Sequence, residues 1–165
     1  MDCLVLLNGD SGTLKTTDLD VFEKHISTEF NNAGHSVTLI RIDEMGMEKA
    51  LDKASDSPAE LLVAAGGDGT VSALAELAWK SGRALGVLPC GTMNLYASTL
   101  KMPGDVFEAV TALARGQEDF ADVATANGKL FINQYAVGFH PRAVKLRNTM
   151  NYGSRIGKIW ATLKA

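Results

Sequence analysis

Residues 66–70, which read Gly-Gly-Asp-Gly-Thr, form the stretch whose residue types and spacing are best suited to chemistry. They follow an apolar run at 61–65 and precede a helical pattern at 71–80, so the sequence predicts a strand, a glycine turn and a helix. Glycines let a ligand approach the backbone closely, and the amides that open a helix favour negative charge. The pattern therefore predicts a phosphate-binding turn, in which the carboxylate of Asp68 serves a metal ion, a proton transfer or a hydroxyl group. An ordinary strand-to-helix turn is the alternative, because Asp-Gly is a common turn dipeptide.

A second glycine turn follows the next apolar run. Residues 84–88 are typical of a buried strand, and they lead into Pro-Cys-Gly-Thr-Met-Asn at 89–94. In α/β sheets, ligands bind beyond the carboxyl ends of the strands, so two such turns could face one ligand. The short polar side chains of Thr70, Thr92 and Asn94 would suit phosphate, although capping a helix is an equally ordinary role for them.

Two familiar nucleotide motifs do not fit the sequence. A dinucleotide-binding fingerprint would need glycine or alanine at Ser72, and an acidic residue rather than Cys90 about twenty residues further on. The segment 9–17 resembles a P-loop, but Leu14 stands directly before the lysine, where that motif requires glycine. The glycine turns therefore belong to another class of site.

The two turns together resemble the catalytic domain of diacylglycerol kinases and related bacterial lipid kinases. The matching residues are Gly-Gly-Asp-Gly-Thr at 66–70 and Leu-Pro-Cys-Gly-Thr-Met-Asn at 88–94, a pattern that sphingosine kinases share. Residues 8–12 resemble the family's Asn-Pro-x-Ser-Gly loop, with Gly9 in place of proline, and residues 122–139 resemble the entry into its second domain. The resemblance spans essentially the whole chain and identifies it with the N-terminal portion of the family domain.

The resemblance implies a transferase of phospholipid metabolism that moves the γ-phosphoryl group of ATP, with Mg²⁺, to a lipid hydroxyl, diacylglycerol being the favoured acceptor. It assigns catalysis to Asp68. It assigns the nucleotide to the residues of the three loops, which are Asn8, Ser11, Gly12, Gly66, Gly67, Gly69, Thr70, Gly91, Thr92 and Asn94. In the family, a later acidic motif supplies the proposed base and helps to bind magnesium, and this sequence contains no such motif. A second departure is Leu95, where many members have aspartate; with Tyr96 and Leu100 it could instead line an acyl-chain groove.

The order of the elements predicts the architecture that positions these turns. Strands and helices alternate from the N-terminus, which favours an α/β domain over residues 1–118 with a parallel sheet and helices on both faces. The expected helices are 19–32, capped by Thr17 or Asp18, then 45–54, 71–80 and 104–115. After Gly116 the pattern changes to a hairpin around Asn127-Gly128, which predicts the start of an antiparallel β domain over 119–165, apparently truncated.

Composition limits the cellular setting. The chain has 165 residues, 46% hydrophobic side chains, a formal net charge of −3 and two cysteines, which predicts a cytoplasmic protein with structural thiols and no signal peptide. After Asp122 there is no Asp or Glu, while basic residues continue to Lys164. The excess of positive charge in this stretch predicts peripheral contact with an anionic membrane surface. The alternative is that the acidic residues which would balance it follow later in a longer domain. No nucleic-acid partner is expected, a homodimer is allowed, and His25 and His35 are interpreted as surface residues.

Two other functions remain open at this stage. NAD kinases share the first motif, so a soluble acceptor such as NAD is one alternative to a lipid. A non-catalytic nucleotide-binding module is the other, since the later acidic motif is missing. If Asp68 is catalytic, Asp68→Ala should reduce turnover by orders of magnitude without unfolding the protein.

Overall fold

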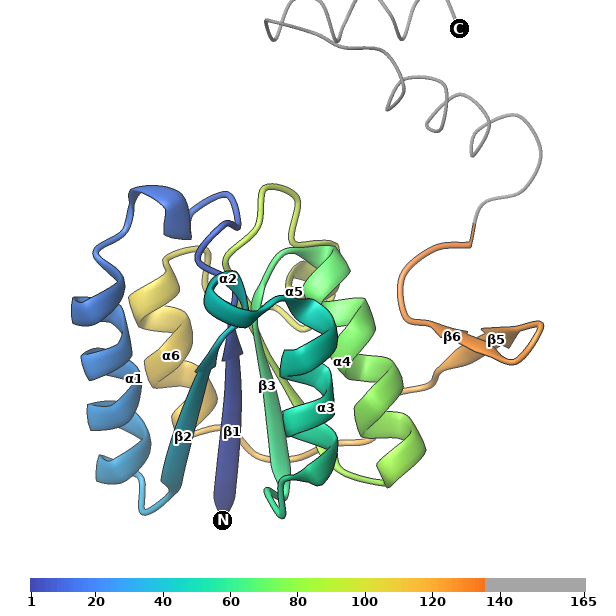
Figure 1. The fold of residues 1–165 in the computed structure, drawn as a ribbon, viewed down its shortest axis with the longest axis horizontal. Coiled ribbons are helices and arrows are strands. Elements are labelled where there is room, and N and C mark those ends of the chain that lie inside the picture. Colours follow the sequence, from blue (N-terminus) through green and yellow to red (C-terminus); the bar gives the residue numbers. More distant parts are fainter. Residues whose placement is uncertain (136–165) are drawn as a thin grey trace, which may run out of the picture. The chain divides into compact units, whose positions relative to one another are not determined.

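The computed structural model describes residues 1–135, whose centre is a sheet of four parallel strands. The strands lie in the order β2–β1–β3–β4 (Figure 1). Their bounds are β1 (Asp2–Leu7), β2 (Ser36–Arg41), β3 (Leu61–Gly66) and β4 (Ala84–Pro89). Because every neighbouring pair is parallel, the four carboxyl ends share one edge of the sheet, at the top of Figure 1.

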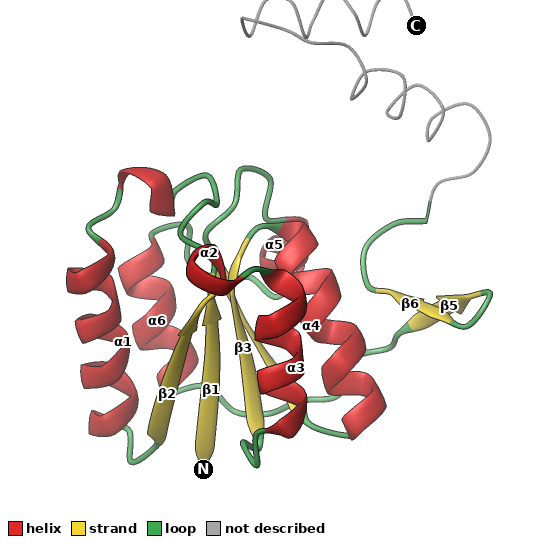
Figure 2. Cartoon of the chain, in the orientation of Figure 1, coloured by secondary structure: helices red, strands yellow, loops and turns green. Residues whose placement is uncertain are grey.

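Helices cover both faces of this sheet (Figure 2). They are α1 (Leu19–Asn32), α2 (Ile42–Met45), α3 (Met47–Asp56), α4 (Asp68–Ser81), α5 (Leu95–Thr99) and α6 (Val106–Ala114). Phe22 of α1 and Val110 of α6 pack on one face with Val5, while Leu74 of α4 packs on the other face with Leu6. The predicted α/β fold with helices on both faces is therefore confirmed.

The central strands explain why the sheet needs two helical layers. All six residues of β3 are buried, as are the last five of β1, so both faces of these strands require an apolar cover. Their sequences are continuous apolar runs rather than alternating ones, as expected of parallel strands buried on both sides.

The helix bounds differ from the predicted ones where glycine and caps intervene. The helix expected over 45–54 is α3, which begins two residues later, at Met47, because Gly46 before it has a φ of 87°; α2 is a separate short helix that precedes Gly46. Helix α4 begins at Asp68, three residues earlier than the apolar periodicity indicates, because Gly67 is its N-cap. Helix α1 matches its predicted bounds, and Asp18 caps it by accepting hydrogen bonds from the next amides.

The histidine interpretation is wrong. Nε2 of His25 lies 3.1 Å from the carbonyl oxygen of Phe107, and Nε2 of His35 lies 3.1 Å from that of Ala114. Both rings are half-buried, and each bonds one end of α6. They therefore tie α6 to α1 and to the turn after it, a role that an isolated histidine in a sequence does not reveal.

A short hairpin follows the α/β elements. Its strands are β5 (Ala124–Ala126) and β6 (Lys129–Phe131), and the turn residues Asn127 and Gly128 have φ values of 51° and 76°. This is the predicted Asn-Gly turn, with shorter strands than expected. The chain divides into compact units at Met1–Asn133 and Gln134–Ala165, which places the hairpin in the first unit. The boundary predicted after residue 118 stays a prediction, and the final helical pattern lies outside the described residues.

Candidate functional site

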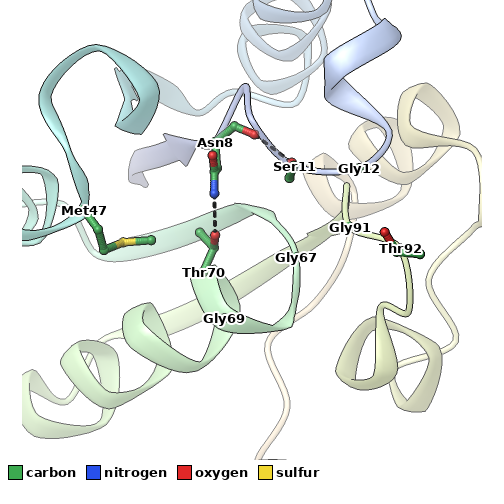
Figure 3. Close-up of a pocket in the computed structure, with 9 residues that line it drawn as sticks. All are labelled: Asn8, Ser11, Gly12, Met47, Gly67, Gly69, Thr70, Gly91 and Thr92. Atoms are coloured by element: carbon green, nitrogen blue, oxygen red, sulfur yellow. Dashed lines mark hydrogen bonds between the residues drawn. The ribbon is translucent and has the colours of Figure 1, made fainter. Parts of the chain in front are cut away.

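A pocket of about 370 Å³ opens at the carboxyl edge of the sheet (Figure 3). Its walls come from the loops that follow β1, β3 and β4, and from the start of α3. The lining residues are Asn8, Ser11, Gly12, Met47, Gly67, Gly69, Thr70, Gly91 and Thr92. Pockets of this size hold small molecules, so this is the candidate ligand site.

The three glycine-bearing loops touch one another through their backbones. A β-carbon built on Gly91 would lie 2.4 Å from the α-carbon of Gly67, and one built on Gly12 would lie 2.8 Å from Oγ1 of Thr92. The amide of Thr13 also donates to the carbonyl of Cys90 at 3.0 Å. Only glycine allows an approach this close. The glycines therefore allow the loops that follow β1, β3 and β4 to lie in contact.

The first loop is held by its own polar groups. Oγ of Ser11 donates to the carbonyl of Asn8 at 2.6 Å, and the side-chain amide of Asn8 donates to Oγ1 of Thr70 at 3.1 Å. The backbone amide of Gly9 donates to Oδ1 of Asp43 at 3.0 Å. Proline, which the related family has at this position, lacks that donor, so Gly9 ties the loop to α2 in a way that proline could not.

The second loop leads directly into the N-terminus of α4. Gly67 is the N-cap, and the first backbone bond of the helix runs from the amide of Val71 to the carbonyl of Gly67. The amides of residues 68–70 therefore have no partner within the helix. Thr70 is only 4% exposed and does not cap the helix; its hydroxyl accepts from Asn8. This end of α4 has backbone amides without a partner in the helix, and it is the positive end of the helix dipole. Both features favour binding of an anion.

The third loop is shaped by the side chain of Asn94. Its Oδ1 accepts from the amide of Gly91 at 2.8 Å, and its Nδ2 donates to the carbonyls of Pro89 and Gly91, each at 3.0 Å. The residue itself has a left-handed backbone, with φ 51°. Asn94 thus fixes the turn that presents Gly91 and Thr92 to the pocket, and its own side chain does not line the pocket.

Asp68 is also not among the residues that line the pocket. Its Oδ1 accepts a hydrogen bond of 2.8 Å from the backbone amide of Leu95, the first residue of α5. The carboxylate is half-buried between α4 and α5. The catalytic role expected of Asp68 stays a prediction, and the observed contact is structural.

Most of the predicted nucleotide residues line this pocket, and three predicted site residues do not. The three are Asp68, Asn94 and Gly66, and a β-carbon built on Gly66 would lie 2.5 Å from Oγ1 of Thr70. Met47 is the lining residue that the sequence did not indicate. It opens α3 after Gly46, far along the chain from any glycine motif, and no sequence signal marked it.

Both cysteines are buried within the described residues. Cys90 is 0% exposed, and burial raises the pKa of its thiol to about 12, so the group is neutral at physiological pH. Cys3 is also buried. Within residues 1–135, no cluster of three or more histidine, cysteine or acidic side chains is placed to hold a metal ion. The metal ligands predicted for a later acidic motif stay a prediction.

Comparison with known proteins gives a consistent result. The family model described as "Diacylglycerol kinase catalytic domain" matches residues 2–126. Over 144 residues the chain is 31% identical to the protein named "Probable lipid kinase YegS-like" from Cronobacter sakazakii, covering 84% of this chain and 46% of that protein. It is 32% identical over 115 residues to a diacylglycerol kinase of Staphylococcus saprophyticus, covering 61% of this chain and 38% of that protein.

The solved structures agree with the sequence relatives. A crystal structure of a diacylglycerol kinase from Bacillus anthracis str. Sterne superposes with a TM-score of 0.70 at 25% identity, covering 99% of this chain and 54% of that one. The chain therefore spans about half the length, or less, of the proteins that it resembles.

Proposed function

This chain belongs to the diacylglycerol kinase catalytic domain family, and on that premise we propose that its pocket binds ATP with Mg²⁺ and that it transfers the γ-phosphoryl group to a lipid hydroxyl. Diacylglycerol is the favoured acceptor. The observation that carries the proposal is the convergence of Gly12, Gly67 and Gly91, from three neighbouring loops, on one pocket beside the N-terminus of α4.

The residues present fit a polyphosphate. Amides at a helix N-terminus and in glycine turns bind phosphate oxygens without needing a cationic side chain. At the same end of the pocket, the exposed hydroxyl of Thr92 offers a further donor. Phosphoryl transfer depends mainly on holding the phosphates and the acceptor in line, with bound magnesium neutralising charge. In this proposal the three loops hold the phosphates of ATP in position.

Calorimetric titration of the chain with ATP, ADP and NAD, with and without Mg²⁺, tests the nucleotide step. We expect adenine nucleotides to bind, and we expect Gly67→Val to abolish binding because its side chain would occupy the space beside Gly91 and the orphan amides. Thr92→Ala should weaken binding by about threefold to tenfold through loss of one hydrogen bond. Gly104→Ala is the control, since a β-carbon there meets nothing within 4 Å and the residue lies outside the pocket.

The acceptor is tested separately, with radiolabelled ATP and mixed vesicles that contain diacylglycerol. Labelled phospholipid would support a lipid kinase, whereas labelled product from NAD alone would replace the lipid proposal by a soluble acceptor. A folded chain that binds no nucleotide in any of these titrations would contradict the proposal at its first step.

The position of Met47 predicts a contact with the adenine base of ATP and not with its phosphates. Figure 3 shows Met47 and Thr92 on opposite sides of the Asn8–Thr70 hydrogen bond, so the thioether lies away from the glycine end. A nucleotide has the same polarity, with phosphates at one end and an aromatic base at the other, and a thioether packs well against an aromatic ring. We expect Met47→Ala to weaken ATP binding about fivefold to tenfold, the loss of roughly 1 kcal/mol of apolar contact.

The control for Met47 is a ligand without a base. Binding of inorganic tripolyphosphate should be unchanged in Met47→Ala, and Met47→Leu should keep most of the ATP affinity. Equal losses for ATP and tripolyphosphate would place the effect of Met47 on the phosphates instead.

The membrane and assembly predictions rest on other parts of the chain. Most of the basic residues after Asp122 lie outside the described residues, so peripheral contact with an anionic membrane stays a prediction, as does a homodimer. Leu100 is exposed and Tyr96 packs against the core, so an acyl-chain groove along α5 also stays a prediction. Among the helices within residues 1–135, none is both long and apolar enough to cross a bilayer.

A further inference from the structure

The start of α5 has no cap of its own. Asn94 occupies the N-cap position, but its backbone is left-handed at φ 51° and its side chain makes no capping bond. That side chain is turned back to the amide of Gly91 and to two carbonyls of the same turn. An uncapped helix start leaves backbone amides without partners, which is costly when they are removed from water.

Asp68 supplies the missing cap from the start of another helix, α4. Its Oδ1 lies 2.8 Å from the amide nitrogen of Leu95, although the two residues are 27 positions apart in the sequence. Asp68 is also the first residue of α4, so one carboxylate links the N-terminus of α4 to the N-terminus of α5. Both helix starts favour a negative group, and each of them follows a glycine turn of the pocket.

This bond and a second contact join the same two turns. The second contact is the backbone approach of Gly91 to Gly67, where an added β-carbon would lie 2.4 Å from the neighbouring α-carbon. One contact alone would let the turns pivot about each other. Two contacts, on either side of Asn94, fix both their spacing and their orientation.

We propose that Asp68 is a positioning residue, which holds α5 through the amide of Leu95 and so sets the second glycine turn against the first. The inference rests on the proposed function, because the spacing of the turns matters for a ligand that contacts both. The role needs an acceptor oxygen at position 68 and not a negative charge. It also uses only the backbone of Leu95, so the side chain at position 95 is free to differ.

The requirement for an oxygen rather than a charge makes the role testable with two variants. Asp68→Asn keeps an oxygen that can accept from the Leu95 amide, while Asp68→Ala removes it. We expect ATP affinity, measured by calorimetry, to stay within about threefold in Asp68→Asn and to fall about tenfold in Asp68→Ala. Amide hydrogen exchange at Leu95 and the next residues should be faster in Asp68→Ala only.

Asp105→Ala is the matched control. Asp105 is the N-cap of its own helix, α6, with Oδ1 accepting from the amides of Phe107 and Glu108 at 2.9 and 3.0 Å, and it does not line the pocket. That variant should lower stability and leave ATP affinity unchanged. A general loss of stability is thereby separated from displacement of the turn.

Two results would overturn the positioning role. One is exchange at Leu95 that is unchanged in Asp68→Ala; the other is an Asp68→Asn protein as impaired in ATP binding as Asp68→Ala, which would show that the charge is needed. If the unsubstituted chain binds no ATP, the proposed function fails on its own, and the exchange comparison still decides whether Asp68 holds α5.

Discussion

Gly91→Ala is expected to abolish ATP binding, lowering affinity about 100-fold or more, and to destabilise the fold. A β-carbon at this position would lie 2.4 Å from the α-carbon of Gly67 and 2.9 Å from Oδ1 of Asn94. The nearer neighbour is backbone, so it cannot rotate away as a flexible side chain would. Relief therefore requires the two turns to separate, which moves apart the amides proposed to share one polyphosphate. The corresponding free-energy loss in binding is about 2.7 kcal/mol.

Gly67 provides the control, because an added β-carbon would be accommodated there but not at Gly91. A β-carbon on Gly67 would lie 3.5 Å from the α-carbon of Gly91, which is ordinary van der Waals contact. We therefore expect Gly67→Ala to keep nearly the wild-type free energy of unfolding, while Gly91→Ala loses about 1–3 kcal/mol through overpacking. Urea unfolding and ATP calorimetry on both variants make the comparison. Equal stability of the two variants, with wild-type ATP affinity in Gly91→Ala, would show that the backbones of Gly91 and Gly67 are not in contact.

The sheet and its covering helices could be predicted because their signals are local. Residues 61–65 and 84–88 are apolar runs bounded by glycine or proline, and Leu19 to Asn32 carries apolar residues at helical spacing after the capping residue Asp18. These patterns depend on neighbours in the chain, and a strand-helix alternation restricts the topology further. Short-range exceptions were harder to predict. Gly46 has a φ of 87°, which lies outside the helical region, so α3 begins after it and not at Met45 as the apolar spacing indicates.

The pocket could be predicted in outline because parallel strands bring the loops that follow them to one edge. The hydrogen bonds within it could not, because residue types alone do not show which partner a polar side chain takes. Asn94 looks like a ligand-binding amide in the sequence, yet its hydrogen-bonding groups are engaged by its own turn. Asp68 looks like a catalytic acid, and its Oδ1 bonds the amide of Leu95. Met47 carries no motif and reaches the pocket only because α3 starts beside it.

Those contacts also change how polar residues in glycine motifs are interpreted. A polar side chain in such a motif can bind the ligand, or it can build the backbone that binds the ligand. A side chain that builds the backbone already has its polar atoms hydrogen-bonded within the protein when no ligand is present, whereas a side chain that binds the ligand has polar atoms free for it. Asn8 lines the pocket, and its side-chain amide also bonds Thr70. The side chain of Asn94 bonds groups of its own turn and does not line the pocket.

Asn94→Ala is therefore expected to disrupt the third loop as a whole. The change removes three hydrogen bonds, each worth about 1 kcal/mol, and leaves alanine in the left-handed conformation at a cost of roughly 1–2 kcal/mol. Because the three bonds share one side chain and are not additive, and because asparagine already carries part of the left-handed cost, the loss in free energy of unfolding should be about 2–4 kcal/mol. ATP affinity should fall about tenfold or more, as the amide of Gly91 is no longer held.

Two further variants separate the cost of the left-handed backbone at position 94 from the loss of the hydrogen bonds. Asn94→Gly removes the same bonds but tolerates φ 51°, so it should be about 1 kcal/mol more stable than Asn94→Ala. Asn94→Asp keeps the acceptor for Gly91 and places a carboxylate oxygen beside the carbonyls of Pro89 and Gly91, so it should resemble alanine rather than asparagine. Urea unfolding of the three variants gives the free energies. Near-wild-type stability and ATP affinity in Asn94→Asp would mean that the two donated bonds do not hold the turn.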